Sequence, residues 1–268
     1  MSFRRLERVP AWRTLALHAW RAPSDPTVYG SLELDARPAL AKLDELRRAS
    51  GERVTLTHLV GKAIAVAIAE RPEVNAIVRR GRIYVRDTVD VFFQVAFEGG
   101  ENLAGAKLER VNEKSVVELA RELGARAARI RERQDDPTQL MTSRLTRLPP
   151  LAMRAAMKLG ESLSYDLGLD LSRFGLPYDA FGSAMVTNVG GFGLSVGHAP
   201  LFPPSRVPVV LTVGAVREAP AVEGDRVVVR PTLTIGASFD HRLLDGFQAG
   251  KLARRLREVL EGPGPELR

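Results

Sequence analysis

One histidine in the chain stands where a predicted strand meets a predicted helix. His241 lies in the run SFDHRLLDG, residues 238–246, just before the last amphipathic stretch. Side chains at such junctions lie at sheet edges, where clefts form, and a histidine there can act as a general base near neutral pH. Asp245, four residues later, can cap the helix or hold an arginine. On spacing alone, a surface loop with a capping Asp and an incidental histidine remains the alternative.

A second segment places a hydroxyl, an amide and three glycines at the end of a predicted strand. The run is AMVTNVGGFG, residues 184–193. Its glycines allow close backbone approach and positive φ angles, and the Thr187 hydroxyl can donate a hydrogen bond to a developing oxyanion. The alternative is a tight turn in which Thr187 and Asn188 only satisfy backbone groups. The run is neither a dinucleotide fingerprint nor a P-loop, because no Gly-Lys-Ser/Thr and no helix follows.

Hydrophobic periodicity and cap residues predict the elements that position these segments. Predicted helices cover residues 35–50 (capped by Asp35 and closed by Gly51), 57–70, 112–134, 151–163 and 245–261. Predicted strands cover residues 28–34, 82–86, 89–97, 183–189, 207–216 and 227–238. The strand at 207–216 is nearly all apolar, which predicts a central place in its sheet. Residues 82–97 resemble a hairpin, and tight turns are predicted at 99–100 and 224–225.

The order of these elements favours one α/β domain that carries an insertion. Residues 1–26 are rich in arginine and predict an N-terminal arm, followed by a domain at 27–268 with a helical insertion at about 135–180. Within the insertion, Arg154 and Lys158 stand among Leu, Ala and Met. This pattern predicts a helix that faces a partner or a membrane, or a helix packed on the domain.

Composition excludes several classes of protein. With 45% hydrophobic residues in 268, the chain can bury a full core and is not disordered. No apolar run is long enough to span a bilayer, and the N-terminus does not resemble a secretory signal, so a cytoplasmic location is expected. Cysteine is absent, which excludes a disulfide scaffold, a thiolate metal centre and a cysteine nucleophile. The histidines at 18, 58, 198 and 241 show no local metal-binding spacing, so no metal is expected.

The basic charge has two possible meanings. The net charge is +7, from 39 Lys and Arg against 32 Asp and Glu. A basic surface can attract nucleic acid, anionic lipid or a phosphorylated cofactor. Here the arginines are scattered and often stand beside Glu or Asp, and aromatic residues make up only 6%. This favours solvated helix faces over a nucleic-acid-binding stripe.

Three segments together resemble the catalytic domain of the acyltransferases of 2-oxoacid dehydrogenase complexes, the dihydrolipoamide acyltransferases. SFDHRLLDG resembles the signature that this family shares with chloramphenicol acetyltransferase. TNVG at 187–190 is similar to the family's Ser/Thr-x-x-Gly turn, and RPEVNA at 71–76 is similar to its PEVNA segment. The resemblance covers roughly residues 27–134 and 181–263. It implies a chloramphenicol acetyltransferase-like α/β fold (an α+β two-layer sandwich), with a mixed sheet covered by helices.

The resemblance implies a role for each catalytic residue. His241 would be the general base that takes the proton from an attacking thiol, without a covalent enzyme intermediate. Thr187 would stabilise the oxyanion, and Asp245 would pair with an arginine to fix the geometry. The family's basic N-terminal pattern is not matched at residues 3–20, so the arginine partner stays open between Arg4, Arg5, Arg13 and Arg21.

The resemblance also implies substrates and partners. Coenzyme A, or its acyl thioester, would be a substrate, with Asn188, Gly190 and Ser238 as candidate contacts and no lipoyl group on this chain. Family members form trimers with active sites between subunits, which implies a homotrimer or a larger trimer-based assembly in which His241 and Thr187 face each other across chains. A separate lipoylated protein or another thiol would accept the acyl group. No nucleic acid and no transmembrane segment are expected.

Three functions therefore compete. The first is an active coenzyme A-dependent acyltransferase, and the second is a trimeric scaffold of the same fold with weak or no activity. The third is a basic module that binds nucleic acid or a membrane. The presence of both His241 and Asp245 favours the first over the second, and the scattered charges disfavour the third.

Overall fold

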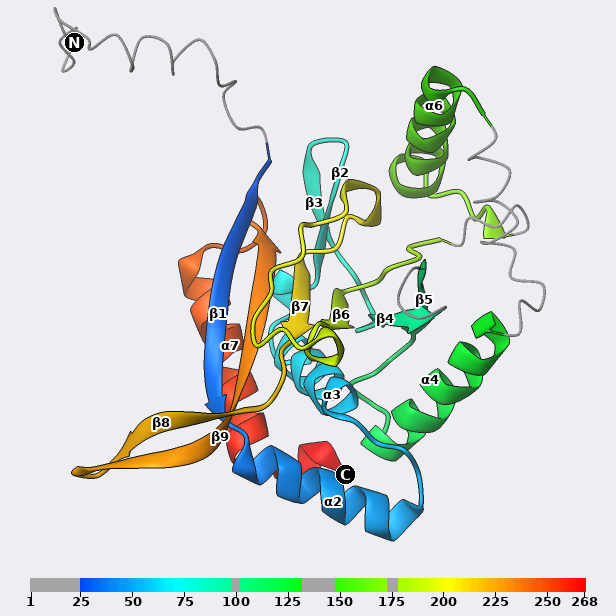
Figure 1. Cartoon of the computed structure of the whole chain (residues 1–268). Coiled ribbons are helices and arrows are strands. Elements are labelled where there is room, and N and C mark those ends of the chain that lie inside the picture. The colour runs from blue at the N-terminus through cyan, green and yellow to red at the C-terminus, as the bar shows by residue number, and fades with distance from the viewer. Residues whose placement is uncertain (1–24, 98–101, 132–147, 173–177) are drawn as a thin grey trace, which may run out of the picture.

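A mixed sheet covered on one face by helices forms the body of the protein (Figure 1). The computed structural model describes residues 25–97, 102–131, 148–172 and 178–268. The predicted fold class is confirmed. The predicted turn at 99–100, the end of the predicted helix 112–134 and nearly all of the predicted arm lie outside the described residues.

The large sheet has the strand order β1-β9-β7-β6-β4-β5, and β8 pairs with the outer half of β9. Its strands are β1 (Thr27–Asp35), β4 (Val91–Phe97), β5 (Asn102–Leu108), β6 (Ala184–Asn188), β7 (Val209–Val213), β8 (Arg217–Glu223) and β9 (Arg226–Asp240). The β4–β6 and β6–β7 pairs are parallel and the others antiparallel. All of β7 is buried in mid-sheet, as its apolar run predicts. Because β7 runs antiparallel to β9, the ends of β6 and β9 lie at opposite edges of the sheet.

Four helices pack on one face of the sheet, with α3 at the centre of the layer (Figure 1). They are α2 (Arg37–Ser50), α3 (Leu56–Ala69), α4 (Val116–Arg131) and α7 (Gly246–Glu261). The helix α3 is apolar nearly all round because the sheet lies on one side of it and α7 and α4 on others. Gly61 is required there, because a Cβ at this position would overlap the ring of Phe93. The buried Lys62 satisfies all three of its donors on backbone carbonyls just before α4.

The hairpin predicted at residues 82–97 is wrong in its pairing. The strand β3 (Arg82–Val85) pairs with β2 (Ala76–Arg79) in a separate two-stranded sheet, whereas β4 pairs with β5 and β6. Neither β2 nor β5 was predicted. The β5 sequence, NLAGAKL, has no β-branched residue, so its conformation comes from pairing with β4 rather than from propensity.

Two further predictions need correction. The predicted strand 207–216 ends at Val213. The turn at 224–225 joins β9 to a separate strand, β8, which was not predicted because it contains charged residues and Pro220. Asp35 does not cap α2: pairing with Thr232 of β9 keeps it in β1, and Ala36 takes the cap position. The carboxylate of Asp35 still accepts a hydrogen bond from the Arg37 N–H, at 3.0 Å.

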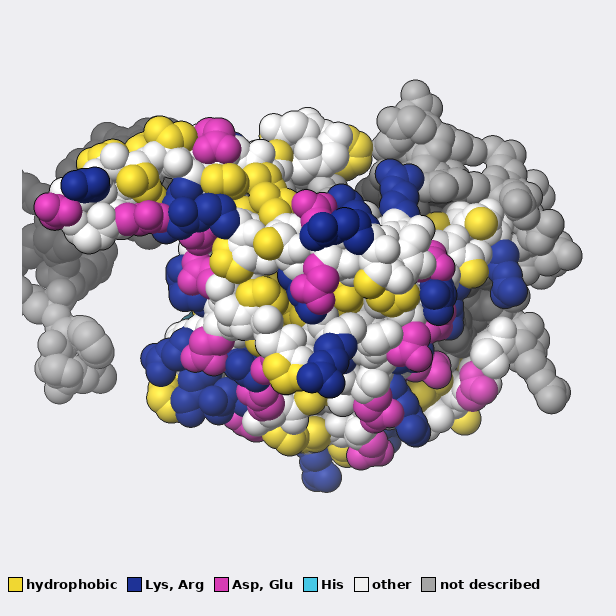
Figure 2. Space-filling view, turned by 90° about the horizontal axis from the view of Figure 1, so that it is seen from below, with side chains coloured by type: hydrophobic (Ala, Val, Ile, Leu, Met, Phe, Trp, Pro, Cys, Tyr) yellow, Lys and Arg dark blue, Asp and Glu magenta, His cyan; other side chains and the backbone are white. Residues whose placement is uncertain are grey.

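Charges of both signs share the surface. Figure 2 shows Lys and Arg interleaved with Asp and Glu over the face seen from below, rather than one basic patch. Many of them form exposed ion pairs, such as Arg257 with Glu261 along α7. Among the described residues, no helix has the length and apolar character needed to cross a membrane.

Candidate functional site

His241 follows directly after β9, and its side chain is exposed. Its backbone N–H donates to the Pro26 carbonyl at 2.9 Å. On one side of it, the buried carboxylate of Asp240 accepts hydrogen bonds from Arg242 Nε at 2.9 Å and Nη2 at 2.6 Å. This pairing raises the pKa of Arg242. The backbone around His241 is therefore fixed while its imidazole stays open to solvent, as a general base requires.

Asp245 caps the final helix. Its carboxylate accepts hydrogen bonds from the N–H groups of Phe247 (2.7 Å) and Gln248 (3.2 Å). In return, the side-chain oxygen of Gln248 accepts a hydrogen bond from the Asp245 N–H. This capping box realises one of the two roles expected for Asp245. The arginines considered as its partner, at positions 4, 5, 13 and 21, lie outside the described residues. Pairing of Asp245 with an arginine therefore stays a prediction.

Thr187 lies near the end of β6, before a turn that packs tightly on the neighbouring strand end. The Asn188 amide donates to the Thr57 hydroxyl on α3 (3.0 Å), and its carbonyl oxygen accepts from the Gly191 N–H (3.0 Å). A Cβ at Gly190 would lie 2.6 Å from the backbone of Gly214 and Ala215. Asn188 and Gly190 thus hold the turn in place, while Asn188 remains exposed.

Ser238 lies inside the sheet rather than at its edge. Its side chain is 0% exposed, and its hydroxyl has no hydrogen-bond partner among the described residues. It lies two residues before the buried Asp240 and on the same face of β9, because side chains alternate along a strand. Because the side chain is fully buried, Ser238 cannot contact a ligand in this arrangement.

Within one copy of the chain, His241 and Thr187 lie far apart. Thr187 pairs with Thr212, and Thr212 pairs with Gly236, so these residues form one row across three strands. His241 follows Gly236 by five residues. With strand rises of about 3.3 Å and strand spacings of about 4.8 Å, the two sites are about 19 Å apart. Reacting groups must approach to about 3–3.5 Å, so the two residues of a single copy cannot serve the same reaction.

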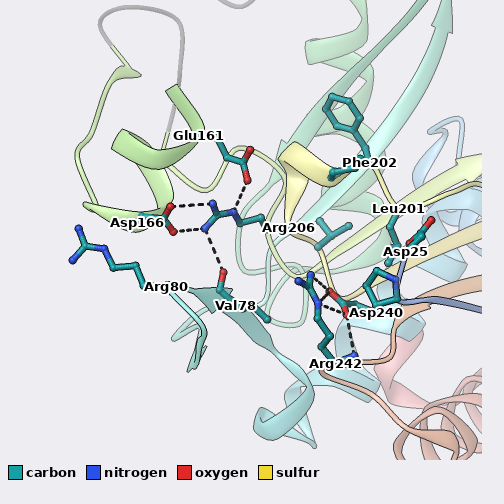
Figure 3. Close-up of a pocket in the computed structure, with 13 residues that line it drawn as sticks. Asp25, Val78, Arg80, Glu161, Asp166, Leu201, Phe202, Arg206, Asp240 and Arg242 are labelled. Carbon is teal, nitrogen blue, oxygen red and sulfur yellow. Dashed lines mark hydrogen bonds and ion pairs between the residues drawn. The ribbon is translucent and has the colours of Figure 1, made fainter. Parts of the chain in front are cut away.

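A cleft of about 360 Å³ lies next to the turn that carries His241, although the residues that line it do not include His241 itself. The residues on either side of the histidine, Asp240 and Arg242, line it together with Pro26 and the apolar side chains of Leu201 and Phe202. Figure 3 shows Arg242 and Asp240 on one side of the cleft and a second charged cluster opposite them. A substrate held in this cleft would lie next to the turn that carries His241.

The second cluster is centred on Arg206. Its guanidinium donates to Glu161 (2.9 Å), to Asp166 (2.7 Å) and to the Val78 carbonyl (3.3 Å), as the dashed lines in Figure 3 mark. Burial disfavours its charge, but the hydrogen bonds to Asp166 and Glu161 outweigh this and raise the pKa of Arg206. The cluster ties the segment after α6 (Pro150–Glu161) to the wall of the cleft.

The sequence model of "2-oxoacid dehydrogenases acyltransferase (catalytic domain)" matches residues 17–146 and 180–267. The chain belongs to this family. The match omits residues 147–179, which include α6 and both acidic partners of Arg206, Glu161 and Asp166.

Curated relatives and a solved structure agree with the family. The chain is 24% identical to the acetyltransferase component of the acetoin cleaving system of Bacillus subtilis over 80% of its length, and 23% identical to the succinyltransferase component of the yeast 2-oxoglutarate dehydrogenase complex over 88%. It covers 43% and 42% of these relatives, so it spans less than half of each. The structure of the dihydrolipoamide acetyltransferase of Azotobacter vinelandii superposes with a TM-score of 0.68 at 19% identity, over 98% of this chain and 95% of that one.

Sequence reasoning missed the residues on either side of His241. Asp240 and Arg242 flank it, and their opposite charges at a strand end were a usable signal. Arg206 gave none, because it follows a proline-rich loop and its acidic partners lie 40 and 45 residues earlier in the chain. Only the fold brings these charges together.

Proposed function

We propose that the chain catalyses coenzyme A-dependent acyl transfer to a thiol acceptor of the dihydrolipoyl type. The observation that carries the proposal is His241, an exposed imidazole on a fixed backbone within the family's motif. Exchange between a thiol and a thioester needs a base poised near neutral pH and an oxyanion donor. Such a base contributes about 10²–10⁴ in rate and one donor about 10²–10³.

The proposed reaction is a single displacement at the thioester carbonyl. His241 takes the proton of the attacking thiol, and the sulfur adds to the carbonyl carbon. The Thr187 hydroxyl donates a hydrogen bond to the resulting oxyanion. The bond to the original sulfur then breaks, and the leaving thiolate takes the proton back from His241. One carbon–sulfur bond forms, one breaks and no covalent enzyme intermediate is needed.

The residue types agree with a relative studied for this purpose. The Azotobacter structure was determined to examine the role of a serine, a histidine and an asparagine in the catalytic mechanism, with the asparagine four positions after the histidine. This chain has a threonine hydroxyl at Thr187, and His241 is followed four positions later by Asp245. The hydroxyl and the imidazole are thus retained in type, and a carboxylate replaces the amide.

The separation of about 19 Å supports a site shared between copies. We infer that His241 of one copy faces Thr187 of another in a homotrimer or a larger trimer-based assembly. Asn188 and Gly190 stay candidates for contacts with coenzyme A, since their turn is at least partly exposed. Ser238 joins them only if the segments that cover it move.

The domain boundaries belong to the same proposal. A catalytic domain at 27–268 with an insertion at about 135–180 agrees with the gap in the family match at 147–179. Because the named relatives transfer acetyl and succinyl groups, the acyl group is left open. A lipoylated partner and a cytoplasmic location stay predictions.

Acyl exchange between acyl-CoA and free dihydrolipoamide tests the proposal. The His241→Ala variant should lose at least about 10²–10³ in kcat while its oligomeric state, measured by light scattering, stays unchanged. His198→Asn is the matched control, because His198 is also exposed but contacts the Gly30 carbonyl. Equal turnover in the His241 variant contradicts the mechanism. An intact oligomer of wild-type protein that transfers no acyl group supports the scaffold function instead.

A further inference from the structure

The helix α6 leaves an apolar surface without a partner in the described structure. Leu151 is 80% exposed and Leu159 60% exposed. With the exposed Ala155 between them, they follow each other at intervals of four residues and form one stripe along the helix. Gly160, near the end of α6, is the buried residue of the helix, and α6 contacts the turn at Ser162–Asp166 that follows it. Figure 1 shows α6 standing away from the sheet. We call these three exposed residues (151, 155 and 159) the α6 stripe.

Positive charge borders the α6 stripe. Arg154 and Lys158 are both exposed and lie one position before Ala155 and Leu159. The sequence contains no Asp or Glu between Asp136 and Glu161, although the whole chain has 32 in 268 residues. A surface that combines apolar and basic residues in this way fits an anionic partner, because complementary charge speeds encounter and selects the partner.

The helix is anchored to the cleft beside His241. Its last residue, Glu161, accepts a hydrogen bond from the Arg206 guanidinium. The same guanidinium donates to Asp166 in the turn that follows α6. Tyr165 adds a hydrogen bond to the Ser205 carbonyl at 3.2 Å. Glu161 and Asp166 themselves line the cleft, opposite Arg242 (Figure 3). A partner bound on α6 would therefore contact a helix whose last residue, Glu161, lines the cleft.

We propose that the α6 stripe, with Arg154 and Lys158, docks an acidic carrier domain that bears the acceptor thiol on a flexible arm. The arm would enter the cleft along Arg242 and present its thiol to His241. This inference rests on the proposed function, since only acyl transfer requires such a partner. An anionic lipid surface would also fit the helix, but binding to lipid would not require α6 to be joined to the cleft by ion pairs.

Kinetics with two acceptors test this docking surface. One acceptor is an isolated lipoyl domain of net negative charge in its reduced form, and the other is free dihydrolipoamide. The variant Arg154→Glu/Lys158→Glu should raise KM for the domain by about tenfold and leave kcat unchanged. Leu151→Ser/Leu159→Ser should act in the same direction. Neither pair should alter the kinetics with free dihydrolipoamide, because neither lies in the cleft.

The matched control is Arg48→Glu/Arg53→Glu. It changes the net charge equally on exposed residues at the end of α2, on the opposite side of the molecule from α6 in Figure 1. Higher salt should raise the wild-type KM for the lipoyl domain and reduce the difference between wild type and the α6 charge variant.

Three results would overturn the inference while the proposed function stands. They are an unchanged KM for the domain in both α6 variants, an equal rise in the control, and a wild type that uses the domain no better than free dihydrolipoamide. Loss of binding to phosphatidylglycerol vesicles in the α6 variants, with unchanged KM for the domain, would assign the surface to lipid. Failure of the wild type with both acceptors would instead reject the proposed function.

Discussion

The two ends of the sheet hold their candidate catalytic side chains by different means. At the end of β9, an ion pair between the buried Asp240 and the exposed Arg242 fixes the backbone around an exposed histidine. At the end of β6, a glycine packed against backbone and an amide bonded to α3 fix the turn after Thr187. The histidine end should therefore be sensitive to charge and the threonine end to volume. Since about 19 Å separates the two ends, each copy would supply half of two different sites.

The largest effect at the threonine end is expected from its hydroxyl. Thr187→Ala should lower kcat by about 10²–10³ and leave KM nearly unchanged, because the hydroxyl would act only on the transition state. Thr187→Ser is the matched control and should keep most of the activity, since it retains the oxygen. Steady-state kinetics with acyl-CoA decide this. An unchanged kcat in the alanine variant removes Thr187 from the oxyanion role.

A change of volume at the same end should reduce stability. Gly190→Ala places a Cβ 2.6 Å from the backbone of Gly214 and Ala215, which we expect to cost about 2–3 kcal/mol in the free energy of unfolding. Gly124→Ala in α4 is the control. Its Cβ would meet nothing within 4 Å, and it should stabilise the protein by about 0.5–1 kcal/mol. Denaturant unfolding measures both, and equal effects would contradict the packing argument.

The contribution to the free energy of unfolding from His58, in the helix that holds the threonine end, should depend on pH. Burial lowers the pKa of His58 to about 4 from its ordinary 6.5, and its Nδ1 accepts from the Thr55 N–H at the start of α3. As the pH falls, the unfolded chain therefore takes up a proton on His58 at a higher pH than the folded chain does. The stabilising contribution is complete above pH 6.5 and is lost as the pH falls toward 4. About 2 kcal/mol should disappear between pH 8 and pH 5.

His58→Gln is the variant that isolates this titration. A glutamine at the third position of the helix keeps a capping box but does not titrate. The variant should lose the extra pH dependence of unfolding between pH 8 and pH 5. Identical pH profiles for variant and wild type would show that His58 does not carry the effect.

The smallest effect is expected from the charge pair at the histidine end. Asp240→Asn removes the negative charge that holds Arg242 and should lower kcat by about tenfold through misplacement of His241, with KM for acyl-CoA nearly unchanged. Asp225→Asn, in the exposed turn between β8 and β9, is the control. A loss of thermal stability with unchanged kcat would make the role of Asp240 purely structural.

The sequence predicted the parts of the fold whose local signals agree with their surroundings. The apolar run of β7, the amphipathic helices α4 and α7, and the capping Asp245 all combine a local pattern with the observed role. The strands β5 and β8 were missed because each is specified by its neighbour in the sheet rather than by its own residues.

For the site, the sequence could place His241 and Thr187 on strand ends, and the family resemblance implied that they meet across chains, but neither gave their arrangement within one copy. That geometry depends on β7 running antiparallel to β9 and parallel to β6, which no local pattern encodes. The Arg206 cluster is another case, since its members become neighbours only when the segment after α6 folds against the cleft.

Mixed oligomers test most directly whether two copies share one site. His241→Ala and Thr187→Ala chains, each nearly inactive alone, should be co-expressed with different tags and purified as hybrids. If the histidine of one copy serves with the threonine of another, one of the three sites in every hybrid trimer pairs two intact residues, and activity should return to about one third of the wild-type value. Hybrids that stay as inactive as their parents would contradict the shared site.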